Sequence, residues 1–354
     1  MPKVIKRIGG VTACLLLAAC SGVGPPTVAR DRFDYVNAVS DSWKRQMLLN
    51  VVKLRYYDSP VFLEVTSIIN QYSVEGEINL GASWVDVDGA GGVVGGTGRY
   101  ADRPTITYAP LTGEKFARNL MTPVPVGAVL HLVQAGYPVE YVFRIIVQSV
   151  NGVENRFGGQ LMQRKEDPRY AELLGLLGQI QQKGGLGMRV KKESEQKSVV
   201  LFFRSATADR SLKELEAVGR ILGIDPDAEE FDVVYGSVAS GGREIAIETR
   251  SILQIIAEIG SQIDISQKDL DEGRTYRVSG DETGVDDYGK LIHIHSGTER
   301  PKSAYTSIAS RGQWFWIDDR DVPSKRTFAF VMLLFSLTET GGQGNAPIVT
   351  VPTN

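Results

Sequence analysis

Cysteine and histidine, the side chains most often used for nucleophilic and metal chemistry, are scarce in this 354-residue chain, which has two cysteines and three histidines. Both cysteines, Cys14 and Cys20, lie within the first twenty residues. The rest of the chain therefore offers no thiol for a catalytic nucleophile, a disulfide or a zinc–thiolate site.

Signatures of common enzyme classes are missing as well. No G-x-S-x-G is present, and the glycine-rich segment 88–98 has neither G-x-G-x-x-G nor the lysine of a phosphate-binding loop. The formal net charge of −3 argues against general binding of a nucleic-acid backbone. Beyond the N-terminus the strongest apolar run is 328–337, far shorter than the ~20 residues of a membrane-spanning helix. We therefore expect neither a nucleic-acid partner nor a non-covalent cofactor.

What the chain does have is an export signal. Lys3, Lys6 and Arg7 precede a short apolar run, Val11–Ala19, as in a secretory signal peptide. The run ends at Leu17-Ala18-Ala19-Cys20, which resembles the lipobox of bacterial lipoproteins. An ordinary signal peptide with a chance cysteine is the alternative. The resemblance implies cleavage before Cys20, which would then carry a diacylglycerol and an N-acyl chain.

The residue after the cysteine is Ser21. In Gram-negative lipoproteins an aspartate there usually retains the protein in the inner membrane, so the resemblance implies the periplasmic face of the outer membrane. Several acyl chains on one residue form a stable anchor. Loss of the three N-terminal cations would change the formal charge to −6, which also argues against a body that lies flat on an anionic leaflet.

The composition shifts predict five segments: a signal peptide, 1–19; a lipidated tether, 20–32; an α+β region, 33–160; a second α+β region, 166–340; and a Gly/Pro-rich tail, 341–354. In the first region, apolar residues at helical spacing predict a helix at 41–57. β-type segments follow at 61–69, 72–74, 78–85 and 104–108, with breaks at Glu75-Gly76 and at a mobile loop or hairpin tip, 88–98. Helices are expected at 112–120, capped by Thr112, and from Pro125 to about 136. The apolar run 139–150 ends at Asn151-Gly152, which is typical of a tight turn.

The second region alternates helices with hairpins. Helices are expected at 170–182, 209–222 and 251–263, and hairpins at 186–192/198–204 and 231–237/243–248. A helix–strand–strand unit thus occurs twice, and a third would begin at Ser251. Further strands at 290–295, 305–309 and 314–317 precede a terminal helix, 323–337. Hairpin-connected strands predict antiparallel sheets with helices packed on one face, an α+β fold.

His293 and His295 are the one pair with metal-ligand spacing. On a strand both rings would point to the same face, and Asp281, Glu282, Asp286 or Asp287 could supply a third ligand. The alternative is two histidines on the solvated face of a half-buried strand.

Trp314 and Trp316 flank Phe315 and would share one face of a strand. Aromatic rings at this spacing can stack on a sugar. They can equally close a core beneath the apolar terminal helix, to which a short polar turn connects them.

Several stretches of the body resemble those of proteobacterial lipoproteins for which no activity is known: Arg103–Tyr108, Pro110–Gly113, Leu132–Gly136 and Thr249–Gln254. This resemblance implies a location and nothing about a reaction. Helix–hairpin modules in envelope lipoproteins also resemble the ring-building domains of secretion machines. The expected function is a lipid-anchored, non-enzymatic scaffold or binding module with an envelope protein partner. The alternative is an envelope hydrolase or metal-binding protein that uses His293 and His295.

Overall fold

The computed structural model describes residues 25–69, 72–83, 91–102, 105–159, 163–193, 196–203, 211–225, 227–228, 230–278 and 290–339. The expected signal peptide, Cys20 and Ser21 therefore lie outside the described residues. The chain divides into two compact units, one of residues 1–43 and 62–111 and the other of 44–61 and 112–354. Within the described residues, no helix has both the length and the apolar character needed to cross a membrane.

A single long helix, α2 (Pro25–Arg55), runs across the sequence boundary between the units. The expectation of a tether up to residue 32 and a helix from residue 41 is wrong, because the helix already begins at Pro25. Proline suits a first helical turn, and 27–40 contains no glycine or proline that would interrupt the helix. Lys53 and Arg55 in the last turn favour its end there.

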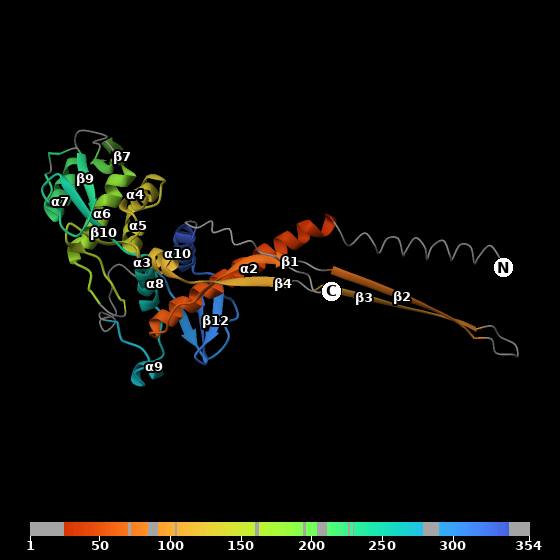
Figure 1. The fold of residues 1–354 in the computed structure, drawn as a ribbon. Coiled ribbons are helices and arrows are strands. Elements are labelled where there is room, and N and C mark those ends of the chain that lie inside the picture. Colours follow the sequence, from red (N-terminus) through yellow and green to blue (C-terminus); the bar gives the residue numbers. More distant parts are fainter. Residues whose placement is uncertain are drawn as a thin grey trace. The chain divides into compact units, whose positions relative to one another are not determined.

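The first unit contains two antiparallel pairs of strands (Figure 1): β1 (Phe62–Ile69) with β4 (Thr105–Leu111), and β2 (Tyr72–Ser83) with β3 (Gly91–Asp102). The expected break at Glu75-Gly76 is wrong, because β2 continues through it. For 88–98 the loop alternative is wrong, because 91–98 belong to β3, whereas the expected hairpin is found between β2 and β3. Residues 84–90 lie outside the described part.

The second unit is built on a six-stranded sheet in the order β6-β5-β10-β9-β8-β7. Its strands are β5 (Val147–Val150), β6 (Val153–Glu154), β7 (Leu186–Glu193), β8 (Gln196–Phe203), β9 (Glu230–Tyr235) and β10 (Glu244–Thr249). The β7–β8 hairpin is confirmed. The prediction of a second hairpin, at 231–237/243–248, is wrong, because β9 and β10 are neighbours that run parallel. The Asn151-Gly152 turn is confirmed, with φ of 46° and 76° between β5 and β6.

Four helices lie beside this sheet (Figure 1): α4 (Val126–Gln134), α5 (Val139–Ile146), α6 (Pro168–Gln182) and α7 (Ser211–Leu222). A fifth, α3 (Glu114–Met121), contacts α8 (Ile252–Ser261) and α10 (Val322–Glu339). α4 contacts β7, β9 and β10, and α6 contacts β6 and β7. Thr112 is not the cap of α3; Gly113 occupies that position without a side-chain hydrogen bond. The apolar run 139–150 is divided between α5 and β5.

The rest of the second unit comprises α8 (Ile252–Ser261), α9 (Gln267–Asp271), a three-stranded sheet and α10 (Val322–Glu339). The small sheet has the order β11-β13-β12, with β11 (His295–Gly297), β12 (Thr306–Ser310) and β13 (Gln313–Ile317). The third helix–strand–strand copy is not found, because α9 follows α8. The α+β fold with mainly antiparallel sheets is confirmed.

The expected boundary between two regions at 160–166 is crossed by the six-stranded sheet. Val150 of β5 pairs with Ile247 of β10, so one sheet takes strands from both expected regions. All these strands belong to the second unit.

Candidate functional site

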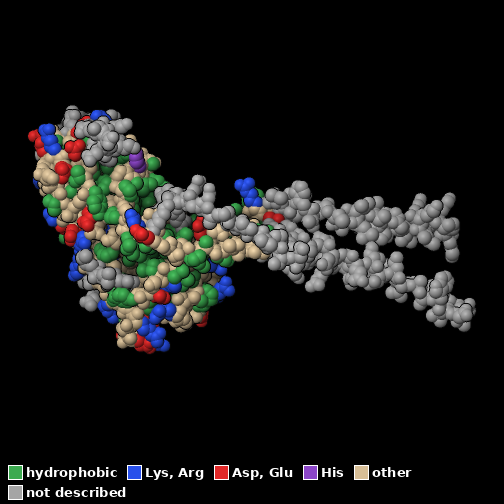
Figure 2. Space-filling model, in the orientation of Figure 1, with side chains coloured by type: hydrophobic (Ala, Val, Ile, Leu, Met, Phe, Trp, Pro, Cys, Tyr) green, Lys and Arg blue, Asp and Glu red, His purple; other side chains and the backbone are tan. Residues whose placement is uncertain are grey.

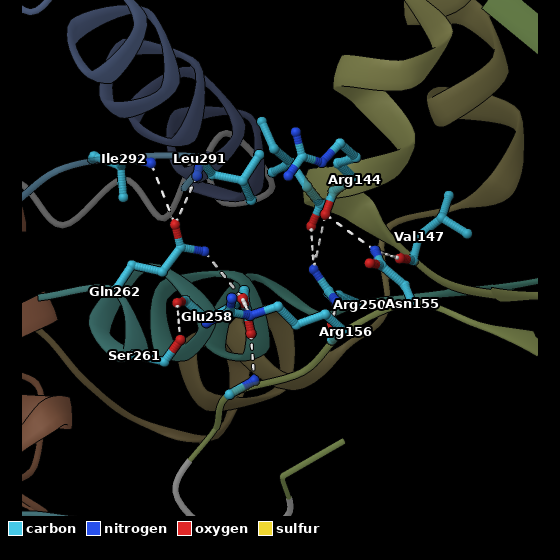
Figure 3. A network of polar contacts seen from close by, with 12 residues as sticks. Arg144, Val147, Asn155, Arg156, Arg250, Glu258, Ser261, Gln262, Leu291 and Ile292 are labelled. Atoms are coloured by element: carbon cyan, nitrogen blue, oxygen red, sulfur yellow. Dashed lines mark hydrogen bonds and ion pairs between the residues drawn. The ribbon is translucent and has the colours of Figure 1, made fainter. Parts of the chain in front are cut away.

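A network of polar side chains crosses the core of the second unit (Figure 3). Arg250, only 1% exposed, donates through one guanidinium nitrogen to the carbonyls of Arg144 (3.1 Å) and Ile145 (3.2 Å), and through the other to the carbonyl of Arg156. Burial lowers the pKa of Arg250, and Glu258 acts in the opposite direction. An arginine nevertheless stays charged. It therefore joins the C-terminal end of α5 to the segment that follows β6.

Glu258 on α8 is the anionic member of the network. Its carboxylate, 3% exposed, accepts from the Gly158 amide (2.5 Å) and the Gln262 side chain (3.1 Å), and lies 3.3 Å from Nε of Arg156. Gln262 in turn accepts from the amides of Leu291 and Ile292. Because these partners are main-chain groups and side chains of the core, we assign the network a structural role.

Asp269 on α9 is a second buried carboxylate that is held by hydrogen bonds. It accepts from the Tyr56 hydroxyl at 2.7 Å and from the Gln313 side chain at 2.6 Å. Burial alone would raise the pKa of Asp269, but these hydrogen bonds lower it below its ordinary value. The carboxylate connects the end of α2, α9 and β13.

His293 and His295 lie near each other at the surface, each beside a carboxylate. Nδ1 of His293 is 3.6 Å from Asp321, and Nδ1 of His295 is 3.2 Å from Asp264. Burial alone would raise the pKa of Asp321, but hydrogen bonds from Ser324 and the nearby histidines lower it. The His293 side chain is 52% exposed and the His295 side chain is 37% exposed.

The separation of the histidine rings bears on the metal hypothesis. Their centroids are 6.3 Å apart. One ion bound to both rings at zinc–nitrogen distances would bring the centroids to about 5 Å at a tetrahedral angle. Among the described residues, no group of three or more metal-ligating side chains is placed to hold an ion. The four acidic residues considered as third ligands, Asp281, Glu282, Asp286 and Asp287, lie outside the described part.

The aromatic strand alternates as expected. Phe315 is fully buried, whereas Trp314 and Trp316 are half-buried on the opposite face, so Phe315 is the ring that this strand gives to the core. The Arg300 guanidinium lies 5.4 Å from the Trp314 ring centre, and the His295 ring lies 5.4 Å from that of Trp316. These contacts already use part of the ring surface on which a sugar would stack.

The β1–β4 pair of the first unit shows a different kind of site, an exposed apolar surface. The strand register places Leu63 opposite Pro110, Val65 opposite Tyr108 and Ile68 opposite Ile106. Directly opposed residues share a face. We call this face, with its six residues, the apolar ribbon face.

A bulge keeps the apolar ribbon face continuous. The pairing register skips Thr66, whose hydroxyl donates to the Thr107 carbonyl at 3.3 Å. The apolar positions of β1 therefore change from odd to even numbers at this point, while those of β4 keep strict alternation. The exposed fractions of Leu63, Ile106 and Tyr108 are 40%, 40% and 52%, whereas Val65 and Ile68 are half-buried. The opposite face carries Glu64, Ser67, Thr105 and Thr107, together with Ala109, the 37% exposed Ile69 and the terminal pair of Phe62, which is buried, and Leu111.

The remaining surface in view is mixed. Figure 2 shows Lys and Arg side chains interspersed with Asp and Glu, and hydrophobic side chains between them. No large field of one sign is seen on this side of the described molecule.

No protein-family model, no curated protein and no solved structure matches this chain.

Neither the buried network nor the apolar ribbon face was predicted from the sequence. The ribbon had a readable signal, since Ile106, Tyr108 and Pro110 alternate with Thr105, Thr107 and Ala109. The bulge at Thr66 hid the matching pattern in β1. Arg250 and Glu258 had no such signal, because the same residue types cover protein surfaces.

Proposed function

We propose that the chain is a lipid-anchored envelope protein on the periplasmic face of the outer membrane, where it acts as a non-enzymatic scaffold through protein contacts. The observation that carries the proposal is the apolar ribbon face. Soluble surfaces seldom expose contiguous apolar side chains unless these serve an interaction. The anchor is supported by the N-terminal sequence alone.

The construction of the ribbon supports a binding role. A two-stranded sheet by itself has marginal stability in water. Two such pairs, β1–β4 and β2–β3, nevertheless follow one another along the first unit. A partner that packs on the apolar ribbon face or adds strands beside it would supply the stability that two strands lack.

The contact role is tested in living cells of the native host with a photo-crosslinking phenylalanine derivative at position 108, where Tyr108 already places an exposed ring. We expect a protein adduct at position 108. The same probe at Thr107, exposed on the opposite face, should give markedly less. Absence of any protein adduct at position 108 would contradict a contact role for the apolar ribbon face.

The anchor is tested by Cys20→Ser, which should abolish incorporation of labelled fatty acid and leave uncleaved precursor or a soluble form. Ser21→Asp is the matched variant: it should keep the label and move the protein to the inner membrane in density fractionation. Firm membrane attachment of Cys20→Ser would place the anchor elsewhere, and an unmoved Ser21→Asp would remove the support for the outer membrane.

A further inference from the structure

We propose that the ribbon of β1 and β4 pairs edge to edge with the ribbons of further copies of this chain, β1 of one copy beside β4 of the next. This inference rests on the proposed contact function and identifies the partner as the chain itself. In this arrangement the strands of successive copies form one continuous sheet, and their apolar ribbon faces lie next to one another.

The first argument is the strand edges. Among the described residues, β1 and β4 each have one strand neighbour, so each has one side on which a further strand can pair. A strand edge presents main-chain N–H and C=O groups that readily pair with another strand. Pro110 has no N–H, so the segments suited to such pairing are 65–69 of β1 and 105–109 of β4.

The second argument is the lack of protection at these edges. Natural proteins guard exposed edges with charged side chains, especially lysine. β1 and β4 together contain one charged residue, Glu64, and no lysine or arginine. A ribbon with exposed Ile106 and Tyr108 and so little charge is suited to pairing.

The third argument selects a copy of the chain over a foreign strand. The outer edges of β1 and β4 run antiparallel to each other, as the strands do. The β4 edge of one copy therefore complements the β1 edge of the next, and every copy satisfies both edges. A head-to-tail contact of this kind repeats from copy to copy, whereas a two-fold contact leaves one edge of each copy open.

The fourth argument is the composition of the faces. Copies added edge to edge keep all apolar ribbon faces on one side of the sheet, and the other side, with Glu64, Ser67, Thr105 and Thr107 beside Ile69 and Ala109, is mixed. The sheet so formed has one wholly apolar face within 63–68 and 106–110, and each copy adds two strands to it. Three or more strands with an apolar face have the stability that a single ribbon lacks.

Disulfide trapping tests the inference in isolated membranes, with differently tagged variants produced in the same cells. Ser67→Cys lies on β1, and Thr105→Cys, Thr107→Cys and Ala109→Cys scan β4 on the same face. The wild-type chain controls for its own cysteines. Opposed cross-strand positions lie within disulfide distance.

We expect a doubly tagged dimer from Ser67→Cys with at least one β4 variant, and only monomers from each variant alone. Ile106→Lys in the trapping pair should reduce the dimer at least several-fold, whereas Thr105→Lys on the opposite face should not. Dimers of single variants alone would show a two-fold contact and overturn the inference. Absence of all dimers would also overturn it; if position 108 still yields an adduct with another protein, the contact function stands without self-pairing.

Discussion

Asp269 illustrates at the scale of one residue how this fold uses a buried charge. The carboxylate is 3% exposed, and it is held by Tyr56, Gln313 and, at 3.8 Å, Arg274. Charge-assisted hydrogen bonds are shorter and stronger than neutral ones, which compensates for the cost of burial. The ionised form of Asp269 therefore stabilises the native state.

Tyr56→Phe should lower the free energy of unfolding by about 1.5–3 kcal/mol at pH 7, because a charged group loses a buried hydrogen bond. The native pKa of Asp269 lies below its value of about 3.9 in the unfolded chain. Its contribution is therefore present above about pH 3.9 and is lost as the pH falls through the native pKa. Urea unfolding should show that the difference in the free energy of unfolding between wild type and variant is smaller at pH 3 than at pH 7.

Tyr235→Phe is the control for this prediction, since the Tyr235 side chain is 58% exposed. Its effect should be within about 0.5 kcal/mol at either pH. An equal loss for Tyr56→Phe at both pH values would mean that the hydroxyl acts through packing and not through the charge of Asp269.

For single residues, the sequence predicted the face of a strand or the conformation of a turn better than it predicted hydrogen-bond partners. The alternation of Trp314, Phe315 and Trp316 and the positive φ values at Asn151 and Gly152 follow from local rules. The partners of Arg250, Glu258 and Asp269 do not, because each comes from a distant part of the chain. The capping box of Ser251 and Gln254 is a local pattern near this network that can be read from the sequence.

At the scale of elements, the length of a connection decides between right and wrong strand pairings. The β7–β8 connection is so short that only an antiparallel hairpin is possible. The connection 236–243 is long enough to return along the roughly 13 Å of four strand residues, so Glu244 pairs with Asp232 in parallel. Its return is held by hydrogen bonds from Asp225 to Gly242 and from Asp232 to Arg243.

The terminal helix α10 is the element whose burial was best predicted. It contacts α3 and α8, and Phe328, Phe330, Val331, Leu334 and Phe335 are at most 5% exposed. Tyr137 and Tyr141 both pack on Phe330. Its apolar residues exceed one helical stripe, and contacts with α3, α8, Tyr137 and Tyr141 bury more than one side of the helix.

Leu334→Ala should therefore lower the free energy of unfolding by about 2–5 kcal/mol, as truncations of buried leucines do. The adjacent Leu333 is 43% exposed and provides a matched control, because Leu333→Ala removes the same atoms from the same helix. That change should cost less than about 1 kcal/mol. Denaturant unfolding measures the stability of each variant, and light scattering measures its association. If Leu334→Ala were as stable as wild type but failed to associate, Leu334 would serve assembly and not the core.

At the scale of the whole molecule, the units follow long-range pairing and not composition. The sequence indicated a boundary at 160–166 because the pattern becomes regular there. The pairing of β5 with β10, across about a hundred residues, joins the two sides of that boundary. Local periodicity contains no information about such a pairing, whereas the ribbon, whose strands pair mainly with each other, separates as part of its own unit.

The ribbon should be removable. Phe62 and Leu111 are opposed at the base of the β1–β4 pair, so their Cα atoms are about 4.5–5.5 Å apart and a bridge of two or three glycines can replace 63–110. Because the second unit has its own sheet, helices and polar network, the shortened chain should unfold cooperatively, with a free energy within about 1 kcal/mol of wild type. Replacing 186–203, which removes β7 and β8 from one end of the six-stranded sheet, is the opposite control and should abolish cooperative unfolding. If excision of the ribbon had that effect instead, β1 and β4 would belong to the core of the second unit, and their exposed apolar side chains would no longer indicate a contact surface.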